Sequence, residues 1–80
     1  MDRQRRTFVV LGFLSTHDAL DAEALLEDLG LDVVPIPAPA AVGALCGIAL
    51  RIPPEQSERA LQYLERAAIE VAGETLIEDV

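Results

Sequence analysis

The residue with the most distinctive chemistry in this chain is its only cysteine, Cys46, which is followed directly by Gly47. A cysteine reacts as its thiolate, so the groups that lower the thiol pKa decide whether it is reactive. Ser15, Thr16 and His17 form a consecutive run that opens a helix. The N–H groups of a first helical turn favour negative charge, and a protonated histidine does the same. These five residues are the candidate site, with Cys46 as the reactive group.

Plainer roles for the same residues remain open. A cysteine between Leu45 and Gly47 in an apolar loop is most simply a small buried hydrophobic residue, and thiols in such surroundings are inert. His17 is then a solvated surface residue and Ser15 only a helix cap. The residue pattern alone favours these structural roles over a thiolate site.

No other catalytic set is present in the sequence. It contains no phosphate-binding glycine loop and no nucleophile elbow. One histidine and one cysteine cannot by themselves form a structural zinc site, and no Asp, Glu and His cluster has metal-ligand spacing. We therefore expect no cofactor, no metal and no independent enzymatic turnover.

The charge distribution excludes several classes of partner. The net charge is −8, and removing Asp2 from the fourteen acidic residues leaves thirteen acids against three arginines from Thr7 onward. Such a body repels nucleic-acid phosphates and anionic membrane surfaces. With no apolar stretch long enough for a bilayer, no signal peptide and a lone free thiol, the sequence predicts a cytoplasmic protein.

The first half of the chain predicts a strand, a helix and an edge strand. Residues 7–14 are apolar on both faces, which is typical of a central strand covered on two sides. Ser15 is expected to cap a helix that ends at Gly30, a glycine suited to the left-handed conformation. Residues 32–36 follow as a strand that prolines confine to the sheet edge.

The second half predicts a long irregular segment, a strand, a helix and a last strand. Residues 37–47 are apolar and irregular, with room for one helical turn at 40–45, and residues 47–52 alternate as a strand does. A second helix begins with Pro54 at its first position. Its predicted core-facing stripe comprises Ala60, Leu61, Leu64, Ala67 and Ala68. The last strand lies within residues 70–79, where Gly73 marks a bulge or bend.

The order β-α-β-β-α-β indicates an α+β, ferredoxin-like two-layer sandwich with a four-stranded antiparallel sheet and two helices on one face. Residues 1–6 are expected to be a mobile basic tail, and residues 7–80 a single domain. This topology brings the start of the first helix close to the loop that contains Cys46. Hydrophobic residues make up 51% of the chain, and the first strand is also apolar on the helix-free face. We therefore expect a second copy, as a homodimer, or a partner protein to cover that open face.

An ordered set of short motifs resembles the selenium/sulfur carrier-like family, formerly a domain of unknown function. The resemblance extends from about residue 8 to residue 80. The motifs that carry it are Phe13-Leu14-Ser15-Thr16-His17-Asp18-Ala19, Ala22-Glu23, Gly30, Pro35-Ile36-Pro37-Ala38-Pro39 and Cys46-Gly47-Ile48-Ala49-Leu50. The resemblance implies a small cytoplasmic protein that holds sulfur or selenium on Cys46 as a persulfide or perselenide. It also implies a sulfur or selenium donor, such as a cysteine desulfurase, as a partner.

Two functional hypotheses follow. In the first, the protein is a sulfur or selenium carrier and Cys46 is its carrier thiol. In the second, the protein is a non-catalytic ferredoxin-like binding or dimerisation module in which Cys46 is structural. Replacing Cys46 distinguishes the two hypotheses. A carrier without this thiol no longer transfers sulfur or selenium, whereas a binding module still binds its partner.

Overall fold

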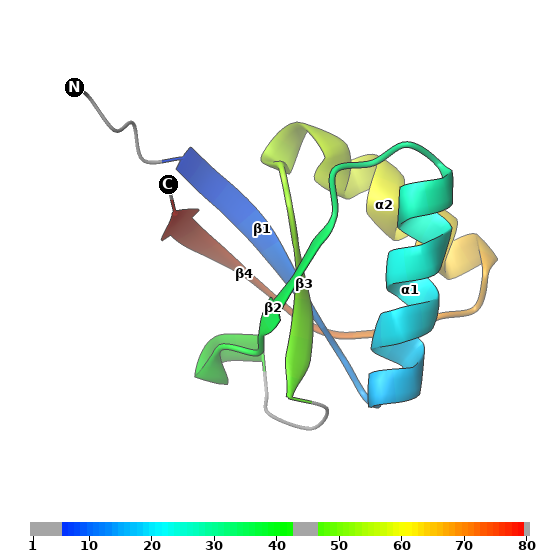
Figure 1. Cartoon of the computed structure of the whole chain (residues 1–80), viewed down its shortest axis with the longest axis horizontal. Helices are drawn as coiled ribbons and strands as arrows, with labels where there is room; N and C mark the ends of the chain where they lie inside the picture. The colour runs from blue at the N-terminus through cyan, green and yellow to red at the C-terminus, as the bar shows by residue number, and fades with distance from the viewer. Residues whose placement is uncertain (1–5, 43–46, 80) are drawn as a thin grey trace.

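The sheet and both helices follow the predicted order. The structure, a computed structural model, describes residues 6–42 and 47–79 (Figure 1). Its elements are β1 (Arg6–Phe13), α1 (Thr16–Asp28), β2 (Val34–Pro37), the 3₁₀ turn η1 (Ala40–Val42), β3 (Ile48–Ile52), α2 (Pro54–Arg66) and β4 (Val71–Asp79). The expected mobile tail, except for Arg6, and the expected carrier residue, Cys46, lie outside the described residues.

The four strands form one antiparallel sheet in the order β2-β3-β1-β4, with both helices on one face (Figure 1). This α+β two-layer arrangement confirms the predicted ferredoxin-like fold. The central position of β1 and the edge position of β2 are also confirmed. The boundaries differ slightly: β1 begins at Arg6, and β2 comprises residues 34–37 instead of 32–36. Pro35 and Pro37 are tolerated there because an edge strand needs hydrogen bonds on one side only.

The main core lies between the helices and the sheet. Val9, Leu11 and Phe13 share the face of β1 that points toward the helices, and all three are buried. They pack with buried residues of β3 and both helices: Leu50, Ile52, Ala19, Ala22, Leu26, Ala60 and Leu64. Burying a valine, leucine or phenylalanine side chain contributes about 1.5–3 kcal/mol. This cluster therefore fixes both helices on the sheet.

The predicted stripe of α2 is wrong at its end. The helix stops at Arg66, and Ala67 and Ala68 are exposed instead of facing the core. Ala68 adopts a left-handed backbone conformation, with φ of 59°, which ends the helix. At the equivalent place after α1, Gly30 has φ of 81°, so the predicted glycine cap is confirmed.

The helix-free face of the sheet is covered in part by the chain itself. We call residues 38–42, which lead from β2 through η1, the strap; η1 lies on the side of the sheet opposite the helices (Figure 1). Val42 from the strap packs with Val10 of β1 and Ala49 of β3, and all three are buried. We expected a second copy or a partner protein to cover this face, but part of the cover comes from the strap.

A second patch of the same face is covered by arginine side chains. The guanidinium carbon of Arg51 lies 4.3 Å from the centroid of the Phe8 ring, and that of Arg6 lies 5.3 Å from it. A guanidinium this close to an aromatic ring is held by a cation–π interaction. Phe8 is consequently 7% exposed although no helix covers it.

Candidate functional site

The sheet brings the start of α1 and the start of β3 to the same end. In the β1–β3 register, Gly12 pairs with Ala49, so the last residues of β1 lie beside the first residues of β3. The first turn of α1 follows β1 directly, and Gly47 directly precedes β3. The topology therefore places Ser15 and Thr16 at the end of the sheet where the Cys46–Gly47 bond joins β3.

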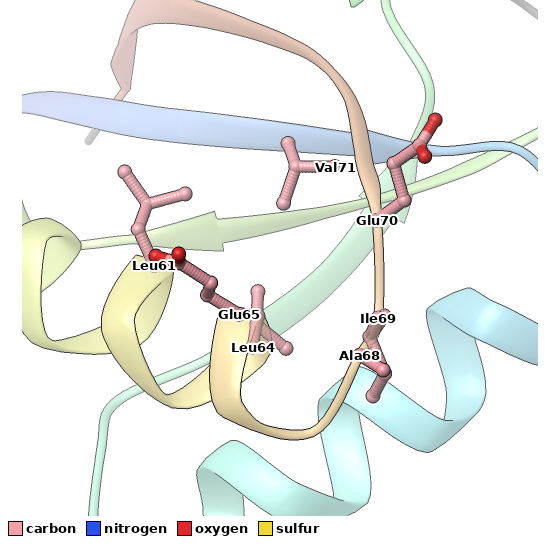
Figure 2. A pocket seen from close by; sticks show the side chains of 7 residues that line it. All are labelled: Leu61, Leu64, Glu65, Ala68, Ile69, Glu70 and Val71. Atoms are coloured by element: carbon pink, nitrogen blue, oxygen red, sulfur yellow. The ribbon is translucent and has the colours of Figure 1, made fainter.

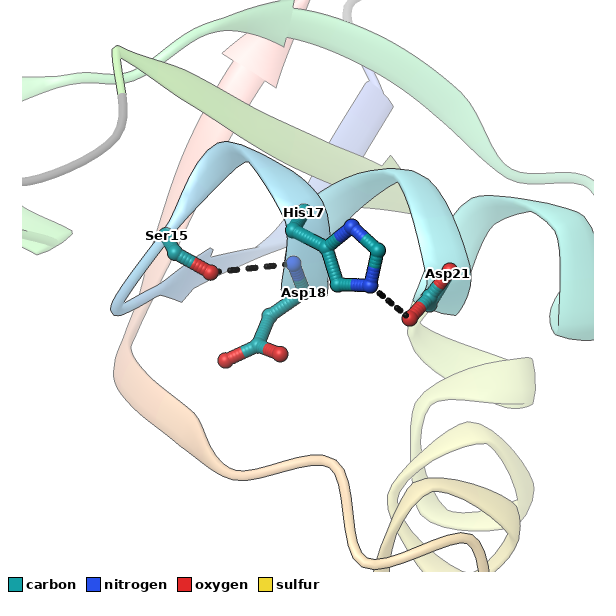
Figure 3. A network of polar contacts seen from close by, with 4 residues as sticks. All are labelled: Ser15, His17, Asp18 and Asp21. Atoms are coloured by element: carbon teal, nitrogen blue, oxygen red, sulfur yellow. Dashed lines mark hydrogen bonds and ion pairs between the residues drawn. The ribbon is translucent and has the colours of Figure 1, made fainter.

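Ser15 caps α1, as predicted. Its backbone is extended, with φ of −144° and ψ of 158°, and its Oγ accepts a hydrogen bond of 3.1 Å from the N–H of Asp18 (Figure 3). The Ser15 carbonyl also accepts a bond of 3.1 Å from the Ala19 N–H. Asp18 adds a negative charge to the first turn, which is favourable at a helix N-terminus. Ser15 therefore has a clear structural task in shaping this turn.

His17 lies on the outer surface of the same turn. Its side chain is 83% exposed, and its Nε2 lies 3.2 Å from the Oδ2 of Asp21, one turn further along the helix (Figure 3). An exposed pair at this spacing contributes only a few tenths of a kcal/mol. The ring contacts Asp21, and its predicted place beside the Cys46 thiol stays a prediction, because Cys46 lies outside the described residues.

Gly47, the neighbour of Cys46, is required by backbone conformation. Its φ is 73°, a region that residues with a side chain rarely adopt, and it is exposed. A Cβ added there would meet no other heavy atom within 4 Å. The Gly47 carbonyl accepts a hydrogen bond of 3.0 Å from the Ala38 N–H, which closes the base of the segment between β2 and β3.

The contact that sequence reasoning missed is the attachment of the strap. Gly12 of β1 and Gly73 of β4 are register partners, and Val42 lies directly over them. A Cβ at Gly12 would lie 2.8 Å from the Val42 Cβ, and a Cβ at Gly73 would lie 2.8 Å from the Val42 carbonyl oxygen. The only sequence signal was the pair of glycines themselves. The bulge predicted near Gly73 is present, since the β1–β4 register shifts between Gly12 and Phe13.

Among residues 6–42 and 47–79, no group of three or more His, Cys, Asp or Glu side chains is arranged to hold a metal ion. Within the same residues, no helix has the length and apolar character needed to cross a membrane.

A groove lies on the helix side of the sheet, between α2 and the start of β4 (Figure 2). Its volume is about 430 Å³, and its lining is mainly apolar with two acidic side chains. The lining residues are Leu61, Leu64, Glu65, Ala68, Ile69, Glu70 and Val71. None of them belongs to the predicted site, and no pattern in the sequence marked them as a group.

A family model matches most of the chain. A search of curated proteins and a search of solved structures each found no similar protein. The model of the family described as "Putative Se/S carrier protein-like" matches residues 8–74, a range that contains most of the sheet, both helices and the strap. The match covers more than half of the chain and agrees with the resemblance noted in the sequence. This chain therefore belongs to the Se/S carrier protein-like family.

Proposed function

We propose that the protein carries sulfur or selenium on Cys46, as a persulfide or perselenide. The observation that carries the proposal is the family match over residues 8–74, a range that includes the chain's only cysteine. The Cys46 thiolate attacks the outer sulfur of a donor persulfide. A new S–S bond forms at Cys46 while the S–S bond of the donor breaks, and the donor leaves as a thiolate. The exchange needs no added oxidant or reductant.

The residues on either side of the cysteine support this proposal. Val42 is anchored on the sheet, and Gly47 is hydrogen-bonded to Ala38, so the described residues on either side of Cys46 are held in place. Gly47 is exposed and carries no side chain, which favours access by a second protein. The first turn of α1 starts at the same end of the sheet, and its N–H groups favour an anion such as a thiolate.

The proposal implies partners and a compartment. The donor is an enzyme that forms a persulfide or perselenide, such as a cysteine desulfurase, and the acceptor is a thiol or another nucleophile. A free carrier thiol persists where disulfides are kept reduced, so we propose that the protein acts in the cytoplasm. The carrier turns over only together with these partners.

Intact mass after incubation with a purified cysteine desulfurase and cysteine tests the proposal. We expect the wild-type protein to gain the mass of one sulfur atom, and Cys46→Ser, checked for folding by circular dichroism, to gain none. Selenocysteine as the donor substrate tests selenium in the same way. Failure of the wild type to load, under conditions in which a small-molecule thiol is persulfidated, would contradict the proposal. A large loss of stability in Cys46→Ser would instead favour a structural cysteine.

A further inference from the structure

Beyond Val71, the helix side of β4 is exposed at Glu74, Leu76 and Glu78. α1 packs on β1 and β3, and α2 packs on β1, whereas β4 forms the edge of the sheet beyond them. Leu76 pairs with Val9 in register, so its side chain lies on the helix side. Leu76 is 66% exposed, more than any other large apolar side chain among the described residues. An exposed leucine in the middle of an edge strand is unusual, because natural edge strands are protected against pairing.

The α2–β4 groove extends this apolar strip at the start of β4. Figure 2 shows the Val71 side chain pointing toward Leu61 across the groove, while the carboxylate of Glu70 points away from it. Val71 is also the first residue of β4, so the groove and the strand edge form one continuous surface. We call this surface, made of the groove and the helix side of β4, the β4 edge surface.

The charges of the β4 edge surface are all of one sign. Glu74 and Glu78 lie on either side of Leu76 on the helix side of β4, and Glu65 and Glu70 border the groove. Residues 67–79 contain no lysine or arginine. An acidic side chain therefore stands two residues before and two residues after the exposed leucine.

We propose that β4 accepts an added strand from another protein, in which basic side chains flank a central apolar one at alternate positions. Addition of a strand to a free sheet edge takes its affinity from main-chain hydrogen bonds and its specificity from alternate side chains. The apolar residue of the partner packs on Leu76, and its two basic residues lie opposite Glu74 and Glu78. Opposite charges directly across two strands are favourable, and like charges are unfavourable.

The same charges argue against a second copy as the occupant. If two copies paired antiparallel about Leu76, Glu74 of each copy would lie opposite Glu78 of the other. Both pairs would bring like charges together, and the only apolar contact on this side of the strands would be between the two Leu76 side chains. The partner is therefore a different, cationic chain.

Two matched peptides test the proposal by NMR titration of the ¹⁵N-labelled protein. One peptide, Thr-Lys-Thr-Leu-Thr-Lys-Thr, has the expected pattern, and the other replaces both lysines with glutamate. We expect the lysine peptide to shift amide signals within residues 71–78 and to bind at least about fivefold more tightly than the glutamate peptide. High salt weakens this preference.

Substitutions show where the peptide binds, and they separate the contribution of the Leu76 contact to binding from that of the acidic side chains. Leu76→Ser should abolish binding of the lysine peptide, whereas Leu20→Ser, at a leucine 51% exposed on α1, should leave it unchanged. Glu74→Lys should reduce binding of the lysine peptide and improve binding of the glutamate peptide. The proposal is overturned if neither peptide binds, if both bind equally, or if the shifts lie outside β4 and the groove. It is also overturned if the protein alone forms a dimer that Leu76→Ser dissociates.

Discussion

At the scale of single residues, the two helices end in the same hydrogen-bond pattern with different residues in the left-handed position. After α1, the Leu31 N–H donates to the Leu26 carbonyl at 3.0 Å, around Gly30. After α2, the Ile69 N–H donates to the Leu64 carbonyl at 2.9 Å, around Ala68. Both are Schellman caps, which favour glycine at this position because a Cβ is strained there. Ala68 therefore holds conformational strain that Gly30 avoids.

This difference predicts that substitutions at Ala68 and Gly30 change the free energy of unfolding in opposite directions. Ala68→Gly should raise the free energy of unfolding by up to about 1 kcal/mol, because the relief of strain exceeds the added entropy of the unfolded glycine. Gly30→Ala should lower it by a similar amount, and a Cβ there meets no atom within 4 Å, so only the backbone is strained. Urea unfolding of both variants measures the two changes. A destabilising Ala68→Gly would show that the methyl group contributes packing at the groove that outweighs its strain.

At the scale of elements, the strap depends on a gap in the side-chain layer of the sheet. Neither Gly12 nor Gly73 has a positive φ, so glycine is not needed there for backbone conformation. The space is what matters, because Val42 of the strap approaches both residues within 3 Å of where a Cβ would stand. Two glycines paired across β1 and β4 thus form the hole into which Val42 fits.

We predict that Gly12→Ala and Gly73→Ala each lower the free energy of unfolding by about 1–3 kcal/mol, because the strap must move to accommodate the methyl group. At Gly73 the contact is with the Val42 main chain, so no change of the Val42 side chain should rescue it. Ala72→Gly is the control. It measures the effect of exchanging alanine and glycine at an exposed position beside Gly73. Urea unfolding and the NMR shifts of Val42 are the measurements. Unchanged Val42 shifts in both variants would contradict this account of the strap.

Local patterns predicted the elements but not the contacts between distant ones. The alternation along β1, the Ser15 cap and the Gly30 cap depend on residues within a few positions of each other, and all are present. The strap depends on contacts between Val42, Gly12 and Gly73, which are some thirty residues apart, and no local pattern carries that information. The end of α2 was misplaced for a related reason: Ala67 and Ala68 continue the apolar spacing, and alanine gives no signal for a left-handed cap.

At the scale of the whole molecule, the proposed carrier segment and the proposed docking surface share one end of the sheet. The first residue of β4, Val71, pairs with Phe13, and β3 begins on the other side of β1 at this same end. Two strand spacings, about 10 Å, separate β4 from β3. A protein bound along β4 would therefore extend close to Gly47. The net charge of −8 favours a cationic partner for either task.

The most direct test of the central claim, that Cys46 is an accessible and reactive thiol, is its alkylation rate in the native protein as a function of pH, followed by intact mass. We predict complete labelling without denaturant. We also predict that the pKa of the thiol lies below that of the same thiol in the urea-unfolded chain, because the first turn of α1 favours the thiolate. Labelling that requires denaturant would contradict the claim, and would identify Cys46 as a buried structural residue.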